Sequence, residues 1–213
     1  MSRCNYCLTN TTTLAFSSPR CDSCSALAVD RADQAPEPCV RVRSALEARG
    51  ISIATRIHFE LRTVTAMQRG IPGLPDLVHG LTRTRRSSDG TLDDKVIVTV
   101  RAGLPLAYFE ACVAHELVHV AIAEAGSDAL PGLIEEGFAE YVAWLYLTQN
   151  STSPDARSVA ERISKRRGDE YGEGYRVVAR AAAREGFERT WRSIGTRRFR
   201  LAPNLSTRPD IHA

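Results

Sequence analysis

The sequence predicts an α+β protein, in which a small twisted sheet lies beside a larger set of helices and a small cysteine module precedes both. Residues 56–62 alternate between apolar and polar side chains, which is typical of a strand with one buried face. From Pro105 onward, apolar residues recur at helical spacing. Four cysteines near the N-terminus form two CxxC pairs, a pattern typical of zinc-binding modules. A length of 213 residues, 43% of them hydrophobic, suits one medium domain with such an appendage.

The cysteine module covers residues 1–30 and contains Cys4, Cys7, Cys21 and Cys24 in the pattern CxxC-x13-CxxC. Two such knuckles supply four thiolates, which is the ligand set of a closed tetrahedral zinc site. So short a segment cannot bury enough apolar surface to fold alone, so bound metal would supply its folding free energy. We therefore expect a structural zinc in a zinc-ribbon or LIM-like knuckle. The alternative is a disordered tail with unligated cysteines.

Composition and charge say little about partners. The net charge of +3 is too small to indicate a nucleic-acid partner. The opening residues, MSRCNYCLTN, lack the apolar run of a secretory signal, and no stretch approaches the roughly 20 uninterrupted apolar residues that span a bilayer. We therefore expect a cytoplasmic protein without a membrane anchor, in which reduced cysteines are available to bind metal.

Residues 31–50 are predicted to form a linker and a short helix. Asp30 to Cys39 is charged and rich in proline, as linkers often are, and Val40 to Arg49 reads as a helix that Gly50 ends. Cys39 and Cys112 lie outside the paired pattern, so we expect both to be buried as small hydrophobic residues.

The main domain is predicted to cover residues 51–200. Ile57, Phe59 and Leu61 alternate with polar residues, and His58 falls on the polar side, so we expect it at the surface or at the rim of a cleft. A second pair of strands is expected around GLTRTRR (80–86) and KVIVTVR (95–101). The sequence between them, SSDGTLDD, predicts a turn at Asp89-Gly90.

The second half of this domain is predicted to be helical. Pro105 and Gly126 delimit a first helix with Leu106, Phe109, Val113, Leu117 and Val120 on one side, and Pro131 begins a second that runs to about Thr148. After a polar loop at 150–154, three arginine-rich helices follow. They are expected at 156–167, 169–184 and 187–194, before a loose tail at 201–213.

The first of these helices contains the sequence HELVH. Residues four apart project from the same helix face, so His115 and His119 can direct both imidazoles at one metal ion. Glu116 would lie beside that ion without binding it. This is the HExxH arrangement, in which two histidines hold zinc and the glutamate takes a proton from the zinc-bound water.

A third metal ligand is expected on the next helix, in LIEEGFAEY. Glu136 follows His119 by seventeen residues, and Glu135 is the rival. The string Glu-Gly-Phe-Ala-Glu resembles the third-ligand helix of gluzincin metallopeptidases, which favours Glu136. Glu140, one turn later, can hydrogen-bond a ligand histidine from behind. Three protein ligands leave one position for water, so the chain is predicted to carry two zinc ions, one catalytic and one structural.

Other residues are candidates for stabilising an oxyanion or binding substrate. Tyr141, Tyr171, Tyr175 and His79 have suitable side chains, although a structural role explains each of them as well.

The block Tyr-Gly-Glu-Gly-Tyr-Arg, Tyr171 to Arg176, places two glycines inside a helix, where they usually mark close packing. We expect this helix to pack on the active-site helices, and Arg176 is a candidate for reaching the cleft.

Residues 50–195 resemble the C-terminal peptidase domain of the DA-one proteins. These are the LIM-domain-containing, ubiquitin-activated zinc peptidases of plants, which have bacterial relatives. The resemblance rests on the AHELVH helix, the Glu-Glu-Gly segment with its downstream Trp-Leu, and the block at 171–176. It implies a zincin-like fold and a zinc-dependent endopeptidase acting on protein or peptide substrates. It also implies that His115, His119 and Glu136 are zinc ligands and that Glu116 is the catalytic base.

The chain departs from this family in three respects. Glu140 stands at a glutamine-like position, the cysteine module is shorter than a LIM domain, and no ubiquitin-interacting helix is apparent. The sequence therefore does not predict whether ubiquitin regulates this protein. The cysteine module is a candidate for docking a partner or selecting substrates.

Two alternative functions are considered. A SprT-like protease would act near nucleic acid, but its zinc ribbon follows the catalytic part. Arginines such as Arg166, Arg167, Arg197, Arg198 and Arg200 are more often a solvated helix face than a phosphate-binding track. A non-catalytic, zinc-stabilised interaction protein would not need Glu116. A peptidase is the preferred interpretation.

Overall fold

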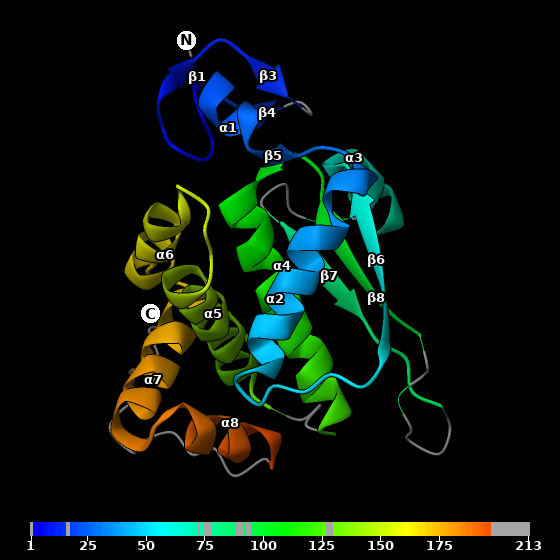
Figure 1. The fold of residues 1–213 in the computed structure, drawn as a ribbon, viewed down its shortest axis with the longest axis vertical. Helices are drawn as coiled ribbons and strands as arrows, with labels where there is room; N and C mark the ends of the chain where they lie inside the picture. The colour runs from blue at the N-terminus through cyan, green and yellow to red at the C-terminus, as the bar shows by residue number, and fades with distance from the viewer. Residues whose placement is uncertain are drawn as a thin grey trace, which may run out of the picture.

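The computed structural model describes residues 2–15, 18–71, 73–74, 78–87, 92, 95–126 and 130–196. Figure 1 shows the N-terminal module at the top, a three-stranded sheet on one side and most helices on the other, with α2 and α4 between them. The predicted α+β class is confirmed by this arrangement. The turn expected at Asp89-Gly90 and the tail at 201–213 lie outside the described residues.

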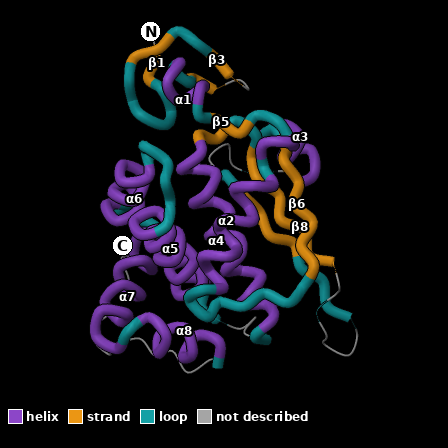
Figure 2. The backbone as a smooth tube through the Cα atoms, viewed as in Figure 1, coloured by secondary structure: helices purple, strands orange, loops and turns teal. Residues whose placement is uncertain are grey.

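The N-terminal module consists of two small hairpins and one short helix. Strand β1 (Ser2–Arg3) pairs with β2 (Asn10–Thr11), and β3 (Leu14–Ala15) pairs with β4 (Ser18–Pro19), both antiparallel. Helix α1 (Asp22–Ala26) follows directly. Figure 2 shows these elements together as a small lobe at the N-terminal end of the molecule. Such short elements bury little apolar surface, which agrees with a module that needs another source of stability.

The module is attached to the rest of the molecule by a strand pair and a buried arginine. Strand β5 (Ala28–Val29) pairs antiparallel with β9 (Leu104–Pro105). The guanidinium of Arg20 donates to the carbonyl oxygen of Gly103 at 2.8 Å and forms an ion pair with Asp30 at 2.7 Å. These contacts fix the module beside the N-terminus of the central helix α4.

The segment predicted as a linker is largely helical. A short 3-10 helix (Ala32–Gln34) leads into α2 (Pro36–Glu47), so the helix expected from residue 40 begins four residues earlier. Pro36 occupies the first position of the helix, where its missing N–H is not needed and its fixed φ is suitable. The prolines therefore begin the helix, and the prediction of a linker up to Cys39 was wrong.

The three-stranded sheet has the order β6-β8-β7. Strand β6 (Arg56–Arg62) is parallel to β8 (Lys95–Arg101), and β7 (Gly80–Arg83) is antiparallel to β8 at the other edge. Both predicted strand regions are confirmed, although β7 ends three residues before the predicted limit at Arg86. His58 is exposed, as its place on the polar side predicted. Val96, Val98 and Val100 of β8 are buried and join the core.

The parallel pairing of β6 and β8 requires a crossover connection. Part of that connection is helix α3 (Val64–Gly70), which the sequence patterns did not predict. Its first residue follows Thr63, whose hydroxyl accepts a hydrogen bond from the main-chain N–H of Ala66, in the way of an N-cap.

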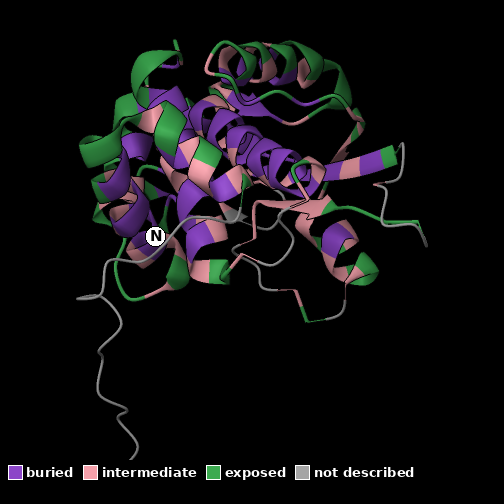
Figure 3. Ribbon diagram, turned by 90° about the horizontal axis from the view of Figure 1, so that it is seen from below, coloured by how far each residue is buried: buried purple, intermediate pink, exposed green. Residues whose placement is uncertain are grey.

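Helix α4 (Leu106–Glu124) is the centre of the core and confirms the helix predicted between Pro105 and Gly126. It is long and apolar enough for a membrane span, but 78% of its apolar 18-residue stretch is buried inside the protein. Figure 3 shows in purple the buried residues that fill the interior. Its apolar residues therefore serve packing. Those of the predicted apolar side that are fully buried are Phe109, Val113, Leu117 and Val120.

The remaining helices confirm the predicted helical half of the domain. They are α5 (Gly132–Gln149), α6 (Ala156–Lys165), α7 (Glu170–Glu185) and α8 (Phe187–Gly195). Helices α5 and α7 lie so close together that a Cβ on Gly174 would collide with the carbonyl oxygen of Leu133. The close packing predicted from the glycines in this block is therefore present.

Candidate metal centre

Two histidines of α4 and one glutamate of α5 converge on one point. The Nε2 atoms of His115 and His119 lie 3.1 Å apart, and Glu136 Oε2 lies 3.1 Å from the first and 3.7 Å from the second. Donor atoms about 2.0–2.2 Å from a tetrahedral zinc stand roughly 3.3–3.6 Å from one another. The three atoms thus have the chemistry and the spacing of a zinc ligand set, and they form one of two groups in the described residues that could hold a metal ion.

The outer nitrogens of both histidines face carboxylates. His119 Nδ1 lies 2.8 Å from Glu135 Oε1, a hydrogen bond that orients the ring, as metal-bound histidines usually require. His115 Nδ1 lies 3.9 Å from Glu140 Oε1, which is too far for a direct hydrogen bond. Glu135, the rival third ligand, therefore lies behind His119 rather than among the converging donor atoms, whereas Glu140 is placed near His115.

Electrostatic attraction holds this group together. Burial alone would lower the pKa of His119, but its hydrogen bonds to Glu135 and Glu136 outweigh burial and raise that pKa to about 10. Burial alone would raise the pKa of Glu136, yet the bonds to His115 and His119 bring it well below its usual range. The rings and the carboxylate therefore favour the converged arrangement.

Glu116 lies beside this group without joining it. Its side chain is buried, and the hydroxyl of Thr82 on β7 donates to Glu116 Oε2 at 2.8 Å. A Cβ on Gly80 of the same strand would lie 2.6 Å from Glu116 Oε1, so only glycine leaves room for the carboxylate there. Thr82 and Gly80 were not singled out from the sequence, because strand periodicity does not show which helix a strand faces.

A cavity of about 420 Å³ opens next to the three donor residues. Its wall is formed by the start of β7, one side of α4, and parts of α5, α6 and α7. His115, Glu116 and Glu140 lie in this wall, together with Val78, His79, Gly80, Tyr108, Ala111, Cys112, Ala143, Val159, Arg162, Ile163, Arg166 and Tyr171. The candidate base and a candidate metal ligand thus share one cavity.

Among the predicted tyrosines, Tyr171 lines this cavity. Its ring centroid lies 5.9 Å from that of His115, and the Arg166 guanidinium stands 4.3 Å above the Tyr171 ring. Arg166 also lines the cavity, although the sequence predicts only a solvated cation at this position. Its guanidinium forms ion pairs with Asp169 at 2.6 Å and with Glu140 at 3.4 Å.

Three other residues predicted as candidates for binding substrate, Tyr141, Tyr175 and Arg176, do not line the cavity. Tyr141 and Tyr175 belong to an aromatic cluster around Trp144, with ring centroids about 6 Å apart, and neither lines the cavity. Arg176 donates to the carbonyl oxygen of Arg166 at 2.6 Å and does not line the cavity either.

His79 lines the cavity opposite Tyr108, at 6.1 Å between ring centroids. Burial, together with the nearby charges of Arg101 and Arg166, lowers the pKa of His79 to about 4. Its imidazole is therefore neutral at physiological pH and can donate or accept one hydrogen bond without adding charge.

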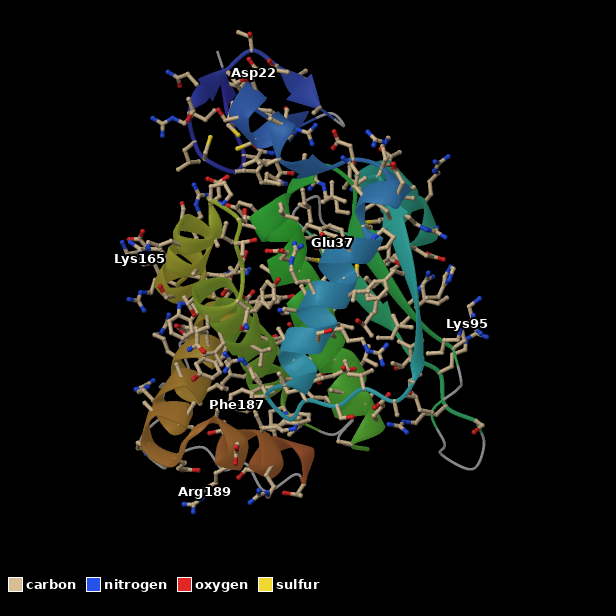
Figure 4. All side chains as sticks on the ribbon, in the orientation of Figure 1. Asp22, Glu37, Lys95, Lys165, Phe187 and Arg189 are labelled. Atoms are coloured by element: carbon tan, nitrogen blue, oxygen red, sulfur yellow. The ribbon has the colours of Figure 1, made fainter. Side chains whose placement is uncertain are left out.

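The four cysteines of the module form the second group that could hold a metal. The Sγ atoms of Cys4, Cys7, Cys21 and Cys24 lie within 4.8 Å of one another, and those of Cys7 and Cys21 are 3.4 Å apart. Figure 4 shows sulfur atoms gathered in the module, in the same lobe as the labelled Asp22. Burial would raise the pKa of Cys4, but main-chain hydrogen bonds from Cys7, Cys21 and Tyr6 lower it to about 6, which favours the thiolate.

Cys39 and Cys112 are buried, as predicted for the two cysteines outside the paired pattern. Burial raises the pKa of Cys39 to about 12 and that of Cys112 well above its usual range, so both remain protonated thiols. Neither belongs to the two metal-binding groups, although Cys112 lines the cavity as an apolar residue.

Comparison of this chain with family models, curated proteins and solved structures gives no match. The two donor sets and the cavity are therefore the observations on which a functional proposal can rest.

Proposed function

We propose that this protein is a zinc-dependent endopeptidase with a zincin-like catalytic domain of the gluzincin type. His115, His119 and Glu136 would bind the catalytic zinc, and Glu116 would be the catalytic base. The observation that carries the proposal is the convergence of two Nε2 atoms and one carboxylate oxygen, in which one of the three donor residues, His115, lines a cavity together with Glu116. The resemblance to the DA-one peptidases supports the same residues in the same roles.

His115, His119 and Glu136 would hold a zinc ion whose Lewis acidity would make a water nucleophilic at neutral pH and polarise a scissile carbonyl. Glu116 is placed to accept a proton from the attacking water and to deliver it to the leaving nitrogen. Burial and the hydrogen bond from the Thr82 hydroxyl hold the Glu116 carboxylate in a fixed position in the cavity wall. Tyr171 and neutral His79 in the cavity wall are positioned to donate hydrogen bonds to a substrate.

The four-cysteine module is proposed to hold a structural zinc. Its four donors form a closed set of thiols, without a histidine or carboxylate that would suit an open catalytic position. A zinc site made of four reduced cysteines would be compatible with the cytoplasm, where thiols stay reduced. The module's exposed face is a candidate for docking a protein partner, and regulation by ubiquitin is one form that this could take.

The alternatives have less support. For a SprT-like role near nucleic acid, the arginines named from the sequence would have to be free to bind phosphates, but one of them, Arg166, is paired with Asp169 and Glu140. Arg197, Arg198 and Arg200 lie outside the described residues. A non-catalytic interaction protein would have no use for a buried carboxylate fixed beside the donor set.

The test combines zinc analysis with proteolysis of unfolded casein. Wild type should contain two zinc ions per chain and cleave casein. Glu116→Gln should keep both ions and lose about 100-fold or more in kcat/KM, because general-base catalysis contributes on that scale. Glu188→Gln, an exposed change of the same kind on α8, should retain wild-type activity. A zinc-loaded wild type that cleaves no casein, or an active Glu116→Gln, would contradict the proposal.

A further inference from the structure

Arg162 is a half-buried arginine that lines the cavity and has no acidic partner among the described residues. Its basic neighbours are paired: Lys165 with Glu161 on the same helix, and Arg166 with Asp169 and Glu140. Within the described part of the chain, no hydrogen bond or ion pair is made by the Arg162 guanidinium. Among the described residues, Arg162 is therefore the cavity-lining cation without an acidic partner.

An unmatched guanidinium in such a place has a physical cost. Partial burial removes hydration from a permanently charged group, and charges removed from water are normally paired. Five N–H donors in a planar fork are suited to a carboxylate, which can accept two of them at once. An incoming carboxylate would thus replace the lost hydration and pair with a guanidinium for which the described part of the chain offers no carboxylate.

The surroundings of Arg162 are mainly apolar. Val159 and Ile163 of α6 line the cavity with it, as do Ala111 and Tyr108 of α4. The charge of Arg162 acts on Tyr108, whose pKa burial raises to about 12. Tyr108 is therefore a neutral neighbour. A carboxylate bound on the cavity side of Arg162 would have these apolar side chains as neighbours, and their lower local dielectric strengthens its interaction with the guanidinium.

The place of Arg162 relative to the candidate zinc ligands follows from α4. Tyr108 precedes His115 by seven residues, so the Tyr108 end of the cavity lies about 10 Å along the helix from the metal group. An extended peptide advances about 3.3 Å per residue. A peptide with its scissile bond at Glu116 could therefore place a group two to four residues away beside Tyr108 and Arg162.

The site is also open to solvent on its other side. A shallow hollow on the outside of α6 is lined by Ser158, Glu161, Lys165 and Arg166, and it shares Arg162 with the cavity. Lys165 points away from the body of the molecule in Figure 4. Arg162 thus lines both the cavity and the outer hollow, as Arg166 does too.

We propose that Arg162 binds a carboxylate of the peptide substrate and makes the enzyme selective for peptides with an acidic group near the scissile bond. The carboxylate would come from a Glu or Asp side chain or from the substrate's C-terminus. This inference rests on the proposed peptidase function and adds a substrate class to it.

The test uses synthetic peptide libraries in which one position at a time is fixed as Glu or as Gln, each prepared with a free and with an amidated C-terminus. Wild type should cleave the preferred carboxylate-containing member about tenfold or more faster, in kcat/KM, than its neutral counterpart, as expected for a hydrogen bond to a charged group. Arg162→Gln should bring this ratio close to one, and Arg162→Lys should keep part of it. Arg157→Gln, an exposed change on the same helix, should keep the wild-type ratio.

A second measurement does not depend on turnover. Zinc-loaded Glu116→Gln protein should bind the carboxylate-containing peptides about tenfold more tightly than the neutral ones in fluorescence anisotropy, and Arg162→Gln added to it should abolish the difference. The Glu-Gln pairs and the acid-amide pairs show which carboxylate is bound.

The outcomes separate the two proposals. Cleavage with equal rates for acidic and neutral peptides would overturn the role of Arg162 and leave the peptidase proposal intact. If zinc-loaded wild type cleaves no peptide, the peptidase proposal fails, and so does the inference that Arg162 selects substrates for it. An unchanged ratio and unchanged binding in Arg162→Gln would also overturn the inference.

Discussion

At the scale of single residues, the two adjacent glutamates of α5 are placed to do different work. Neighbouring positions on a helix point about 100° apart. Glu136 therefore reaches the inner side of the histidine pair, where its Oε2 meets both Nε2 atoms, while Glu135 reaches the outer Nδ1 of His119. One carboxylate is suited to bind a metal and the other to orient a ligand.

We expect Glu136→Ala to lose one of two zinc ions, because it removes one of three protein ligands. Glu135→Ala should keep both ions under zinc saturation but bind the catalytic one about 10 to 100 times more weakly, as is usual when the partner behind a ligand histidine is lost. Zinc content after dialysis and competition with a chelator measure both effects. The reverse result, with zinc lost from Glu135→Ala alone, would show that Glu135 is the ligand.

At the scale of elements, the glycines of α5 and α7 set the distance between the two helices. Gly137 and Gly174 face each other, and a Cβ on either would collide with the main chain of the other helix. Because α5 provides Glu140 and α7 provides Tyr171, this close approach also sets the distance between two residues of the cavity wall.

We expect Gly174→Ala to lower the free energy of unfolding by about 3 kcal/mol, since main-chain atoms cannot move aside as a flexible side chain can. Gly132→Ala, at the start of α5, is the matched control: its Cβ would meet Glu170 Oε2 at an ordinary 3.6 Å. It should change stability by less than about 1 kcal/mol, because alanine is also the better helix former. Urea unfolding of zinc-loaded protein measures both. Equal losses of unfolding free energy in the two variants would show that the close approach of α5 and α7 does not exclude a Cβ at position 174.

At the scale of the whole molecule, the cysteine module and the cavity are connected through α4. The Tyr108 hydroxyl donates to the carbonyl oxygen of Tyr6 at 3.0 Å, and the two rings meet edge to face at 5.1 Å. Tyr108 also lines the cavity, so one residue contacts the module and the candidate substrate site. Arg20 adds a buried attachment between the module and the turn before β9.

We expect Arg20→Met to destabilise the protein by about 2 kcal/mol, because the buried guanidinium joins Asp30 and the Gly103 carbonyl and its loss leaves both without this donor. Arg31→Met is the control: Arg31 pairs with Asp33, but both side chains are about two-thirds exposed, at 67% and 69%. Such exposed pairs are screened by solvent and contribute little to stability, so Arg31→Met should leave the unfolding transition nearly unchanged. Thermal or urea unfolding at saturating zinc distinguishes the two variants, and similar losses would contradict a tight attachment of the module.

Local periodicity predicted most of the fold. The alternation around Ile57 and Phe59 and the apolar spacing from Phe109 to Val120 reflect contacts within one strand or helix, and the structure confirms both elements. The start of α2 and the whole of α3 were missed, because proline was read as a linker signal and the short α3 carries little periodicity.

By itself, the sequence determined which residues could form donor sets. Residues four apart on one helix bring His115 and His119 together, and paired CxxC motifs bring the four cysteines together. Only the tertiary structure decided which neighbours complete these sets. The rotation of α5 against α4 separates Glu136 from Glu135, the close packing of α7 brings Tyr171 but not Tyr175 to the cavity, and the position of β7 places Thr82 and Gly80 beside Glu116. These choices depend on how distant segments pack, and local spacing does not encode that packing.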